Sequence, residues 1–205
     1  MRLYFKPGAC SLASRIVLIE LGRDFEAIRV DTETGLTEDG HDFSAVNPRG
    51  YVPALQLADG RTLTENTAIL QFLGDLEPGT LTPPAASWGR VRLQEILSFL
   101  SSELHKAFSP FFRGEAVGEA RAPALSLLER KIGDLEAMLP SEAPFFLCGD
   151  LSVADIYLFV ILSWADFIGV DLSEWPRISR FMDLLRERES VRLALAQEGR
   201  LRATA

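Results

Sequence analysis

The sequence has little cysteine and no cluster of basic residues. Among its 205 residues only Cys10 and Cys148 are cysteines, too few and too widely separated for a disulfide framework or a cysteine-rich metal site. This scarcity is typical of a reducing compartment, so we expect a cytoplasmic protein with no bound metal. Acidic residues number 29 and basic residues 21, and no stretch concentrates lysine or arginine as a phosphate-binding surface does. Nucleic acid is therefore not an expected partner.

Long apolar runs are also missing. The most apolar stretch, residues 156–162, lies between Asp155 and Asp166 and falls well short of the ~20 residues that span a bilayer. The first residues reach Pro7-Gly8 before they form the apolar core of a signal peptide. We expect neither export nor membrane association, and residues 156–162 predict a buried helix.

The first third of the sequence alternates between strand and helix patterns. Residues 2–5 predict a strand, and residues 10–21 predict a helix that Gly22 ends. Residues 25–30 predict a second strand, followed by a polar loop over residues 31–42. A strand, helix and strand in this order predict a parallel strand pair.

A hairpin and a helix complete this first part. Residues 52–57 and 61–63 flank a turn at Asp59-Gly60 and predict a β-hairpin. A helix is predicted from Thr64 on, because apolar residues recur on one helical face. These residues are Ile69, Phe72, Leu73 and Leu76. We therefore predict an α/β domain over residues 1–77.

The remainder of the sequence predicts only helices. Residues 78–86 contain three prolines and a glycine, which predicts a linker between domains. Apolar residues then recur with helical spacing over the rest of the chain, so residues 87–205 predict an all-helical domain. One helix follows this linker, and others are predicted at residues 119–139, 153–167 and 177–188. Ser152 and Asp155 resemble a capping box at the start of one of them.

Cys10 is the first candidate for chemistry. It lies where a strand, a Pro-Gly loop and a helix meet, so its sulfur is expected near the unpaired amides of the helix start, which favour a thiolate. Ser11 places a hydroxyl beside it. The alternative is a small buried cysteine that fills space, the role we expect for Cys148. Because no second cysteine is separated from Cys10 by two residues, as in a dithiol motif, a mixed disulfide with an external thiol is favoured over an internal disulfide.

Two further short motifs suggest contacts for a peptide-like ligand. A cis bond between Val52 and Pro53 would leave the Val52 backbone free to pair with an extended peptide, whereas an ordinary trans proline at a strand start is the alternative. Glu65 and Asn66 offer a carboxylate for an ammonium group, and helix amides with a side-chain amide for a carboxylate. An α-amino acid head group carries both charges, but simple helix capping explains the same residues.

The first helix of the second part carries a polar stripe. Ser98, Ser102 and His105 are spaced to share one face, which lines a cleft or is simply solvated. The aromatic residues Phe108, Phe111 and Trp164 belong either to an apolar pocket or to the core. The residues alone leave these alternatives open.

Five segments together resemble the beta class of bacterial glutathione transferases over nearly the whole chain. They are residues 6–13 (KPGACSLA), 45–50 with 52–55 (AVNPRG and VPAL), 63–66 (LTEN), 102–106 (SELHK) and 149–155 (GDLSVAD). The resemblance implies the glutathione transferase fold, with a thioredoxin-like α/β N-terminal domain and an all-α C-terminal domain. It also implies a homodimer.

The resemblance assigns roles to particular residues. It implies that Pro53 is cis, that the Val52 backbone binds the cysteinyl part of glutathione, and that Glu65 and Asn66 bind its γ-glutamyl end. Cys10 and His105 are implied to lie near the glutathione sulfur. Other residues are implied to line the glutathione site, either within one subunit or across a dimer: Ser11, Ser98, Ser102, Glu103, Leu104 and Lys106.

Three functions are consistent with these features. The leading hypothesis is conjugation of the glutathione thiolate to an electrophilic small molecule held by Phe108, Phe111 and Trp164. The second is glutathione-dependent redox chemistry, as a thiol transferase, peroxidase or reductive dehalogenase, through a mixed disulfide at Cys10. The third is a ligand-carrying or interaction module without catalysis.

The resemblance also points to one difference. Gly35 stands where beta-class relatives can place a lysine that meets a glutathione carboxylate, so we predict weaker glutathione binding than in relatives with that lysine.

Overall fold

The computed structural model describes residues 1–147 and 150–202 and divides the chain into two compact units. The first unit joins Met1–Pro78 to the C-terminal residues from Glu187 on, and the second spans Gly79–Arg186. Cys148, predicted to be structural, lies outside the described residues.

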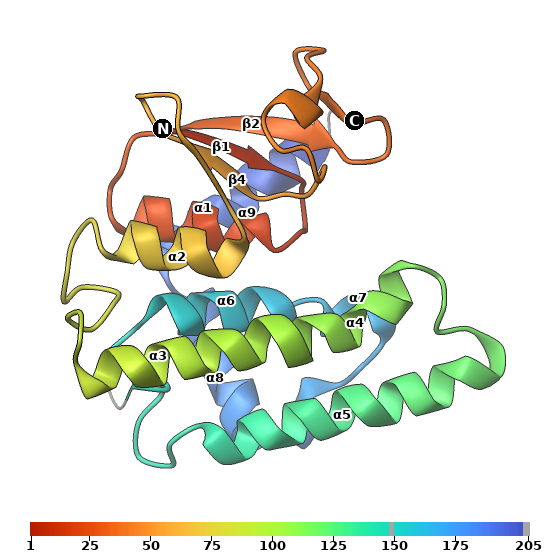
Figure 1. Cartoon of the computed structure of the whole chain (residues 1–205). Coiled ribbons are helices and arrows are strands. Elements are labelled where there is room, and N and C mark those ends of the chain that lie inside the picture. The colour runs from red at the N-terminus through yellow and green to blue at the C-terminus, as the bar shows by residue number, and fades with distance from the viewer. Residues whose placement is uncertain (148–149, 203–205) are drawn as a thin grey trace. The chain divides into compact units, whose positions relative to one another are not determined.

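A five-stranded mixed sheet organises the first unit (Figure 1). Its order is β3-β2-β1-β4-β5, and β1 pairs in parallel with β2 but antiparallel with β4, which confirms the predicted parallel pair and hairpin. The short strand β3 lies within the segment predicted to be a loop and pairs with the end of β2. The strands are β1 (Arg2–Phe5), β2 (Glu26–Asp31), β3 (Leu36–Thr37), β4 (Ala54–Gln56) and β5 (Thr62–Thr64).

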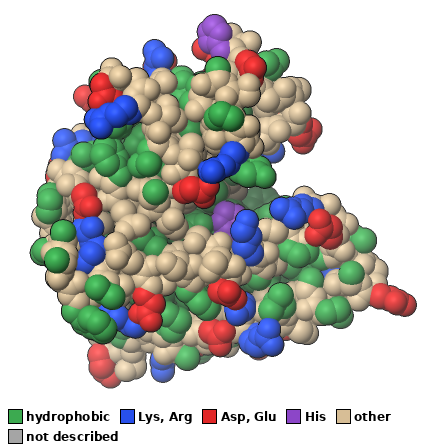
Figure 2. Space-filling view, in the orientation of Figure 1, with side chains coloured by type: hydrophobic (Ala, Val, Ile, Leu, Met, Phe, Trp, Pro, Cys, Tyr) green, Lys and Arg blue, Asp and Glu red, His purple; other side chains and the backbone are tan. Residues whose placement is uncertain are grey.

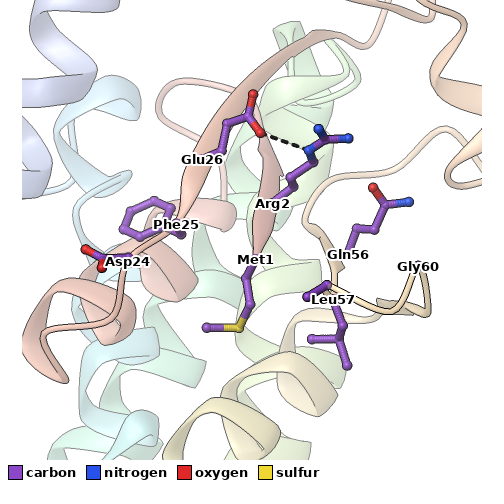
Figure 3. A pocket seen from close by; sticks show the side chains of 9 residues that line it. Met1, Arg2, Asp24, Phe25, Glu26, Gln56, Leu57 and Gly60 are labelled. Atoms are coloured by element: carbon purple, nitrogen blue, oxygen red, sulfur yellow. Dashed lines mark hydrogen bonds and ion pairs between the residues drawn. The ribbon is translucent and has the colours of Figure 1, made fainter.

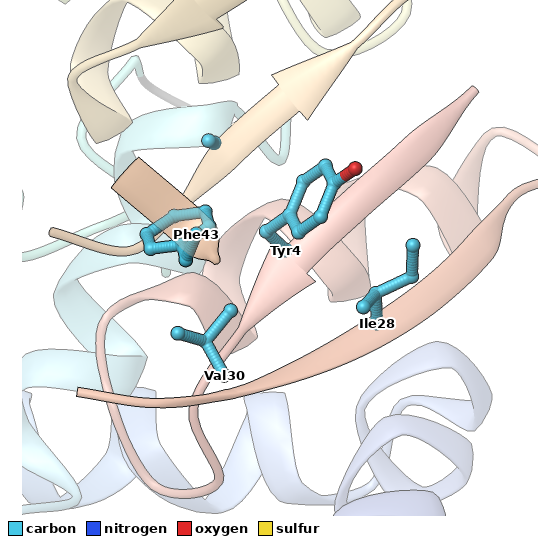
Figure 4. Close-up of a cluster of buried hydrophobic side chains, with 5 residues drawn as sticks. Tyr4, Ile28, Val30 and Phe43 are labelled. Atoms are coloured by element: carbon cyan, nitrogen blue, oxygen red, sulfur yellow. The ribbon is translucent and has the colours of Figure 1, made fainter. Parts of the chain in front are cut away.

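Helices cover one face of this sheet, and a short apolar cluster covers the other. The helices α1 (Ser11–Glu20) and α2 (Asn66–Gly74) pack against each other, as Figure 1 shows. On the opposite face, the 3-10 turn η1 (Phe43–Ala45) places the Phe43 ring 5.5 Å from that of Tyr4. Figure 4 shows the Phe43 and Tyr4 rings together with the side chains of Ile28 and Val30. The central strand β1 is therefore buried on both faces.

The last helix corrects the predicted domain boundary. Helix α9 (Glu189–Arg202) was not predicted, and it belongs to the first unit rather than to an all-helical domain that runs to the C-terminus. It packs along α1, where Arg188 and Ser190 bond the Glu20 carboxylate. Its mixed composition of charged and apolar residues gives no sign of which unit it joins, because the contacts that hold it are distant in sequence.

The second unit is built from helices, as predicted. The segment predicted as a linker packs onto this unit, since the Leu81 carbonyl accepts a bond from the Val153 N–H and the Pro83 carbonyl accepts from Arg90. No helix among the described residues is long and apolar enough to cross a membrane. The longer helices are α3 (Trp88–Phe99), α4 (His105–Phe112), α5 (Arg121–Met138), α6 (Val153–Leu162) and α8 (Pro176–Arg186). The shorter elements are η3 (Gly118–Ala120), α7 (Ala165–Ile168) and η4 (Leu172–Glu174).

Two predicted helices of this unit are interrupted. A π-helical turn, η2 (Leu100–Leu104), lies between α3 and α4 and inserts one residue into what the periodicity predicts as a single α-helix. The predicted helix over residues 153–167 is divided into α6 and α7. Both interruptions fall next to residues of the candidate site.

The start of α6 confirms the capping box. The Ser152 N–H donates to the Asp155 carboxylate at 2.8 Å, and the Phe146 N–H donates to it at 3.1 Å. Asp155 has no exposed surface. Burial raises the pKa of Asp155 to about 6, while the donated hydrogen bonds act in the opposite direction. At pH 7.5 the carboxylate is ionised and satisfies backbone groups that water does not reach.

Replacing Asp155 with alanine is expected to lower the free energy of unfolding by about 3 kcal/mol, because buried N–H donors lose their acceptor. Asp171→Ala is the matched control, since Asp171 accepts a backbone N–H at the start of η4 but is exposed. We expect it to cost only about 0.5 kcal/mol. Urea unfolding at pH 7.5 measures both, and equal losses would contradict this account.

Candidate functional site

The loop between β1 and α1 is held in place from two directions. Gly8 has a φ of 74°, a conformation that favours glycine, and its N–H donates to the Glu198 carboxylate of α9 at 2.7 Å. The Ser11 hydroxyl bonds both the N–H and the carbonyl of Lys6 at 3.3 Å. This loop therefore enters α1 in a defined geometry.

The position of Ser11 corrects one expectation. Ser11 was expected to bind glutathione, but it has no exposed surface and its hydroxyl closes the loop through Lys6. The first residue of a helix points back toward the chain that precedes it, and this direction takes the hydroxyl away from solvent. Ser11 thus supports the loop.

Cys10 lies at the start of α1 with its thiol half-buried. Its Sγ is 3.7 Å from the Val52 carbonyl oxygen, to which the thiol donates. Helix starts carry unpaired N–H groups and a partial positive charge, both of which stabilise a nearby thiolate. The structure thus brings two of the predicted site residues together.

The Val52–Pro53 peptide bond is cis, which confirms that prediction. Val52 lies just before β4, and the described residues supply no hydrogen-bond partner to its N–H. The preceding turn is fixed by the buried Asn47, whose side-chain amide donates to the Tyr51 carbonyl at 2.7 Å. An extended peptide can therefore add to the backbone at Val52, as strands add to the edge of a sheet.

Glu65 immediately precedes α2 in an uncommon backbone conformation. Its φ is 66°, a value rare for residues other than glycine and frequent at functional sites. Its carboxylate is exposed and lies 3.4 Å from the Arg49 guanidinium. No side chain caps this helix start, so the alternative of simple side-chain capping does not describe these residues.

Asn66 differs from its predicted role. Its Oδ1 accepts a hydrogen bond from Ser14 at 2.8 Å, and its Nδ2 donates to the Cys10 carbonyl at 3.2 Å. This side chain therefore ties α2 to α1 rather than reaching a ligand. The first amides of α2, including that of Asn66, are the groups that suit a carboxylate.

The polar stripe predicted in the second unit is not continuous. The hydroxyls of Ser98 and Ser102 are exposed and donate to backbone carbonyls one turn earlier, those of Gln94 and Ser98. His105 instead is partly buried, because the extra residue of the π-helical turn rotates it away from the face that the α-helical period predicts.

Three neighbours of His105 were also predicted to line the glutathione site. The Glu103 carboxylate lies 2.7 Å from the ammonium of Lys131 on α5. Leu104 has no exposed surface, so it belongs to the core and offers no surface to a ligand. Lys106 is exposed.

His105 is held by aromatic neighbours from the same unit. Its Nδ1 lies 2.7 Å from the Tyr157 hydroxyl of α6, and its ring meets Trp164 edge to face at 4.8 Å. Burial, with a smaller effect from the charge of Lys106, lowers the pKa of His105 to about 4. The imidazole is therefore neutral at physiological pH.

Trp164 lies at the centre of an aromatic group. Phe108 and Phe112 contact its ring at 5.6 and 5.3 Å, and they share one face of α4 because they are four residues apart. Phe112 is 54% exposed, whereas Phe108 is fully buried behind it. The predicted pocket residue Phe111 instead lies under the Arg121 guanidinium at 5.7 Å. Phe112 is thus an exposed aromatic neighbour of Trp164 that sequence analysis did not single out.

The candidate site residues form two groups, each within its own unit. Cys10, Val52 and Asn66 are linked by hydrogen bonds in the first unit. His105 and Trp164 are in contact in the second unit. Among the residues missed, Tyr157 gave no signal because it lies in an uninterrupted apolar stretch, and Glu198 gave none because its partner Gly8 is distant in sequence.

Other surfaces fit the predicted chemistry less well. A hollow of about 690 Å³ in the first unit is lined by Met1, Arg2, Glu26 and their neighbours, and none of the predicted site residues lines it (Figure 3). On the face in Figure 2, acidic and basic side chains are interspersed and form no basic stripe. Within the described residues, no group of three histidine, cysteine or acidic side chains is placed to hold a metal.

Comparison with known families matches both parts of the chain. Residues 8–76 match the glutathione S-transferase N-terminal domain, and residues 83–184 match the corresponding C-terminal domain. Glutathione S-transferase GstA of Escherichia coli O157:H7 is 42% identical over 97% of this chain and 99% of that protein.

Solved structures agree in sequence and in fold. A beta-class glutathione S-transferase of Sphingomonas chungbukensis has a TM-score of 0.92 and 44% identity, over 97% of this chain and 99% of that one. A sphingomonad glutathione S-transferase in complex with glutathione has a TM-score of 0.90 and 43% identity, with the same coverage. The chain therefore belongs to the glutathione S-transferase family, as a member of its bacterial beta class.

Proposed function

We propose that this enzyme binds glutathione along the first unit, at Cys10, Val52 and Glu65, and transfers its thiolate to an electrophilic carbon. The observation that carries the proposal is the contact between the Cys10 thiol and the Val52 carbonyl at 3.7 Å. A peptide thiol paired with the Val52 backbone brings its sulfur to the start of α1. Conjugation forms a carbon–sulfur bond, and the leaving group departs with the electron pair of its own bond.

Each part of glutathione has a proposed partner. The cysteinyl backbone pairs with the N–H and carbonyl of Val52, and Pro53 keeps this segment outside the ladder of β4. The ammonium of the γ-glutamyl group meets the exposed Glu65 carboxylate, and its carboxylate meets the first amides of α2. The Arg49 guanidinium beside Glu65 is displaced or shared in this arrangement.

Residues of the second unit complete the proposal. The family resemblance assigns His105 to the glutathione sulfur, and it assigns Ser98, Ser102, Glu103 and Lys106 to the lining of the glutathione site. We also propose a homodimer, in which some of these residues come from the partner subunit. Light scattering on the purified protein tests the dimer. The proposed location of the enzyme is the cytoplasm.

The electrophile is proposed to be an apolar, aromatic molecule. The exposed Phe112 offers a ring face on which such a molecule stacks, and the buried rings of Trp164 and Phe108 support it from the protein side.

Cys10 also favours a second activity, thiol exchange. Its thiolate attacks the disulfide of oxidised glutathione, a mixed disulfide forms at Cys10, and one glutathione thiolate leaves. The half-buried thiol at the start of α1 suits this attack. Conjugation, by contrast, uses the sulfur of glutathione itself, and Cys10 contributes to it only as a neighbour.

Cys10→Ala separates these activities. We expect the variant to lose thiol exchange completely, whereas the kcat for conjugating a chlorinated nitrobenzene falls by about tenfold or less, because one hydrogen bond near the sulfur is removed. Enzyme assays and mass spectrometry of the mixed disulfide measure the two effects. Cys148→Ala is the control for loss of a thiol. Abolished conjugation in Cys10→Ala would show instead that one mechanism serves both reactions, and no conjugation by the unmodified enzyme with several electrophiles would refute the proposed transfer.

Gly35 allows a test of glutathione affinity. Its φ of 75° favours glycine, and a Cβ placed there meets no atom within 4 Å. A lysine at this position therefore strains the backbone but has space. Gly35→Ala carries the same strain without the charge, so the comparison of Gly35→Lys with Gly35→Ala isolates the ammonium.

We expect the KM for glutathione to be about threefold lower in Gly35→Lys than in Gly35→Ala, because an exposed ion pair with a glutathione carboxylate adds up to about 1 kcal/mol. The difference should shrink at high salt. Steady-state kinetics at two ionic strengths measure it. Identical KM values would mean that this loop does not approach glutathione.

A further inference from the structure

The hydrogen bond between His105 and Tyr157 connects two helices of the second unit. His105 opens α4, and Tyr157 lies on α6 with 1% of its surface exposed. The Nδ1 to Oη distance is 2.7 Å, short for a bond that involves nitrogen. The Trp164 ring, edge to face with the imidazole at 4.8 Å, limits rotation of His105 about its side-chain bonds.

Two proton arrangements satisfy this bond. Either the Tyr157 hydroxyl donates to an unprotonated Nδ1, or a protonated Nδ1 donates to the Tyr157 oxygen. The phenol hydroxyl, with a pKa of about 10, is a much stronger acid than the N–H of a neutral imidazole. The unprotonated Nδ1 of His105 is also a stronger base than the hydroxyl oxygen of Tyr157. Donation from the Tyr157 hydroxyl to Nδ1 is therefore favoured.

The charge state of His105 agrees with this arrangement. Burial lowers the pKa of His105 to about 4, so the ring carries one proton at physiological pH. A neutral ring whose Nδ1 accepts a hydrogen bond must carry that proton on Nε2. Nε2 is the ring atom that remains for a ligand.

We propose that Tyr157 is a positioning residue. Its hydroxyl donates to Nδ1 and fixes the proton of His105 on Nε2, and His105 then meets the glutathione sulfur as a neutral hydrogen-bond donor and takes no proton from it. This inference rests on the proposed function, which assigns His105 to that sulfur. The thiol proton leaves to solvent, and the Nε2–H stabilises the thiolate that remains.

Nitrogen NMR of the histidine rings tests the tautomer directly in the enzyme without ligand. The chain has two histidines, so His41→Gln assigns the signals. We expect His105 in the unmodified enzyme to show a protonated Nε2 and an unprotonated Nδ1. In Tyr157→Phe we expect these signals to move toward the average of the two tautomers. A protonated Nδ1 in the unmodified enzyme would overturn the inference, whatever the variant does.

The ionisation of bound glutathione tests the consequence. In Tyr157→Phe the midpoint for thiolate formation, followed by its ultraviolet absorbance, is expected to rise by about half a unit to one unit, since an oriented hydrogen bond is lost. The kcat for conjugation should fall by about three- to tenfold at pH 6.5 and approach the unmodified value at higher pH. A purely structural defect would lower kcat equally at every pH.

Tyr4→Phe is the matched control, because it removes a tyrosine hydroxyl that bonds Gln56 in the first unit. It should leave the histidine signals and the thiol midpoint unchanged. An unchanged midpoint for glutathione bound to Tyr157→Phe would overturn the inference but not the proposed function. Failure of the unmodified enzyme to bind glutathione would refute both.

Discussion

The contact between the Cys10 thiol and the Val52 carbonyl is the interaction on which the account of this enzyme depends. It joins the start of α1 to the backbone just before β4, two segments that are 42 residues apart. One side of the contact supplies helix amides that stabilise negative charge, and the other supplies peptide groups that can pair with an extended ligand. A peptide thiol satisfies both sides at once.

Much of the first unit serves to hold this contact in place. Ser11 and Glu198 fix the loop before Cys10, and Asn66 ties α2 to the Cys10 carbonyl. Asn47 fixes the turn before Val52. These buried polar groups act on the ligand site through the backbone. A buried polar group without a hydrogen-bond partner lowers the stability of the fold. Each of these bonds therefore restricts the positions that the backbone can take.

The sequence predicted those features that depend on local patterns. The strands and hairpin of the first unit, the helices of the second and the capping box at Ser152 follow from periodicity and turn residues. The π-helical turn before His105 was not predictable, because its residues fit an α-helical period equally well. The roles of Ser11, Asn66 and Phe112, and the return of α9 to the first unit, depend on partners distant in sequence or on the direction in which a side chain points. Local patterns carry neither kind of information.

The Val52 amide provides the most direct measurement. Tyr51-Val52 is the only Tyr-Val pair in the sequence, so labelling tyrosine carbonyls with ¹³C and valine nitrogens with ¹⁵N yields one NMR signal for this amide. Our account predicts that saturating glutathione shifts this signal and slows its hydrogen exchange at least ~10-fold, as an N–H paired in a strand is protected. An unchanged signal and exchange rate in the presence of bound glutathione would contradict it.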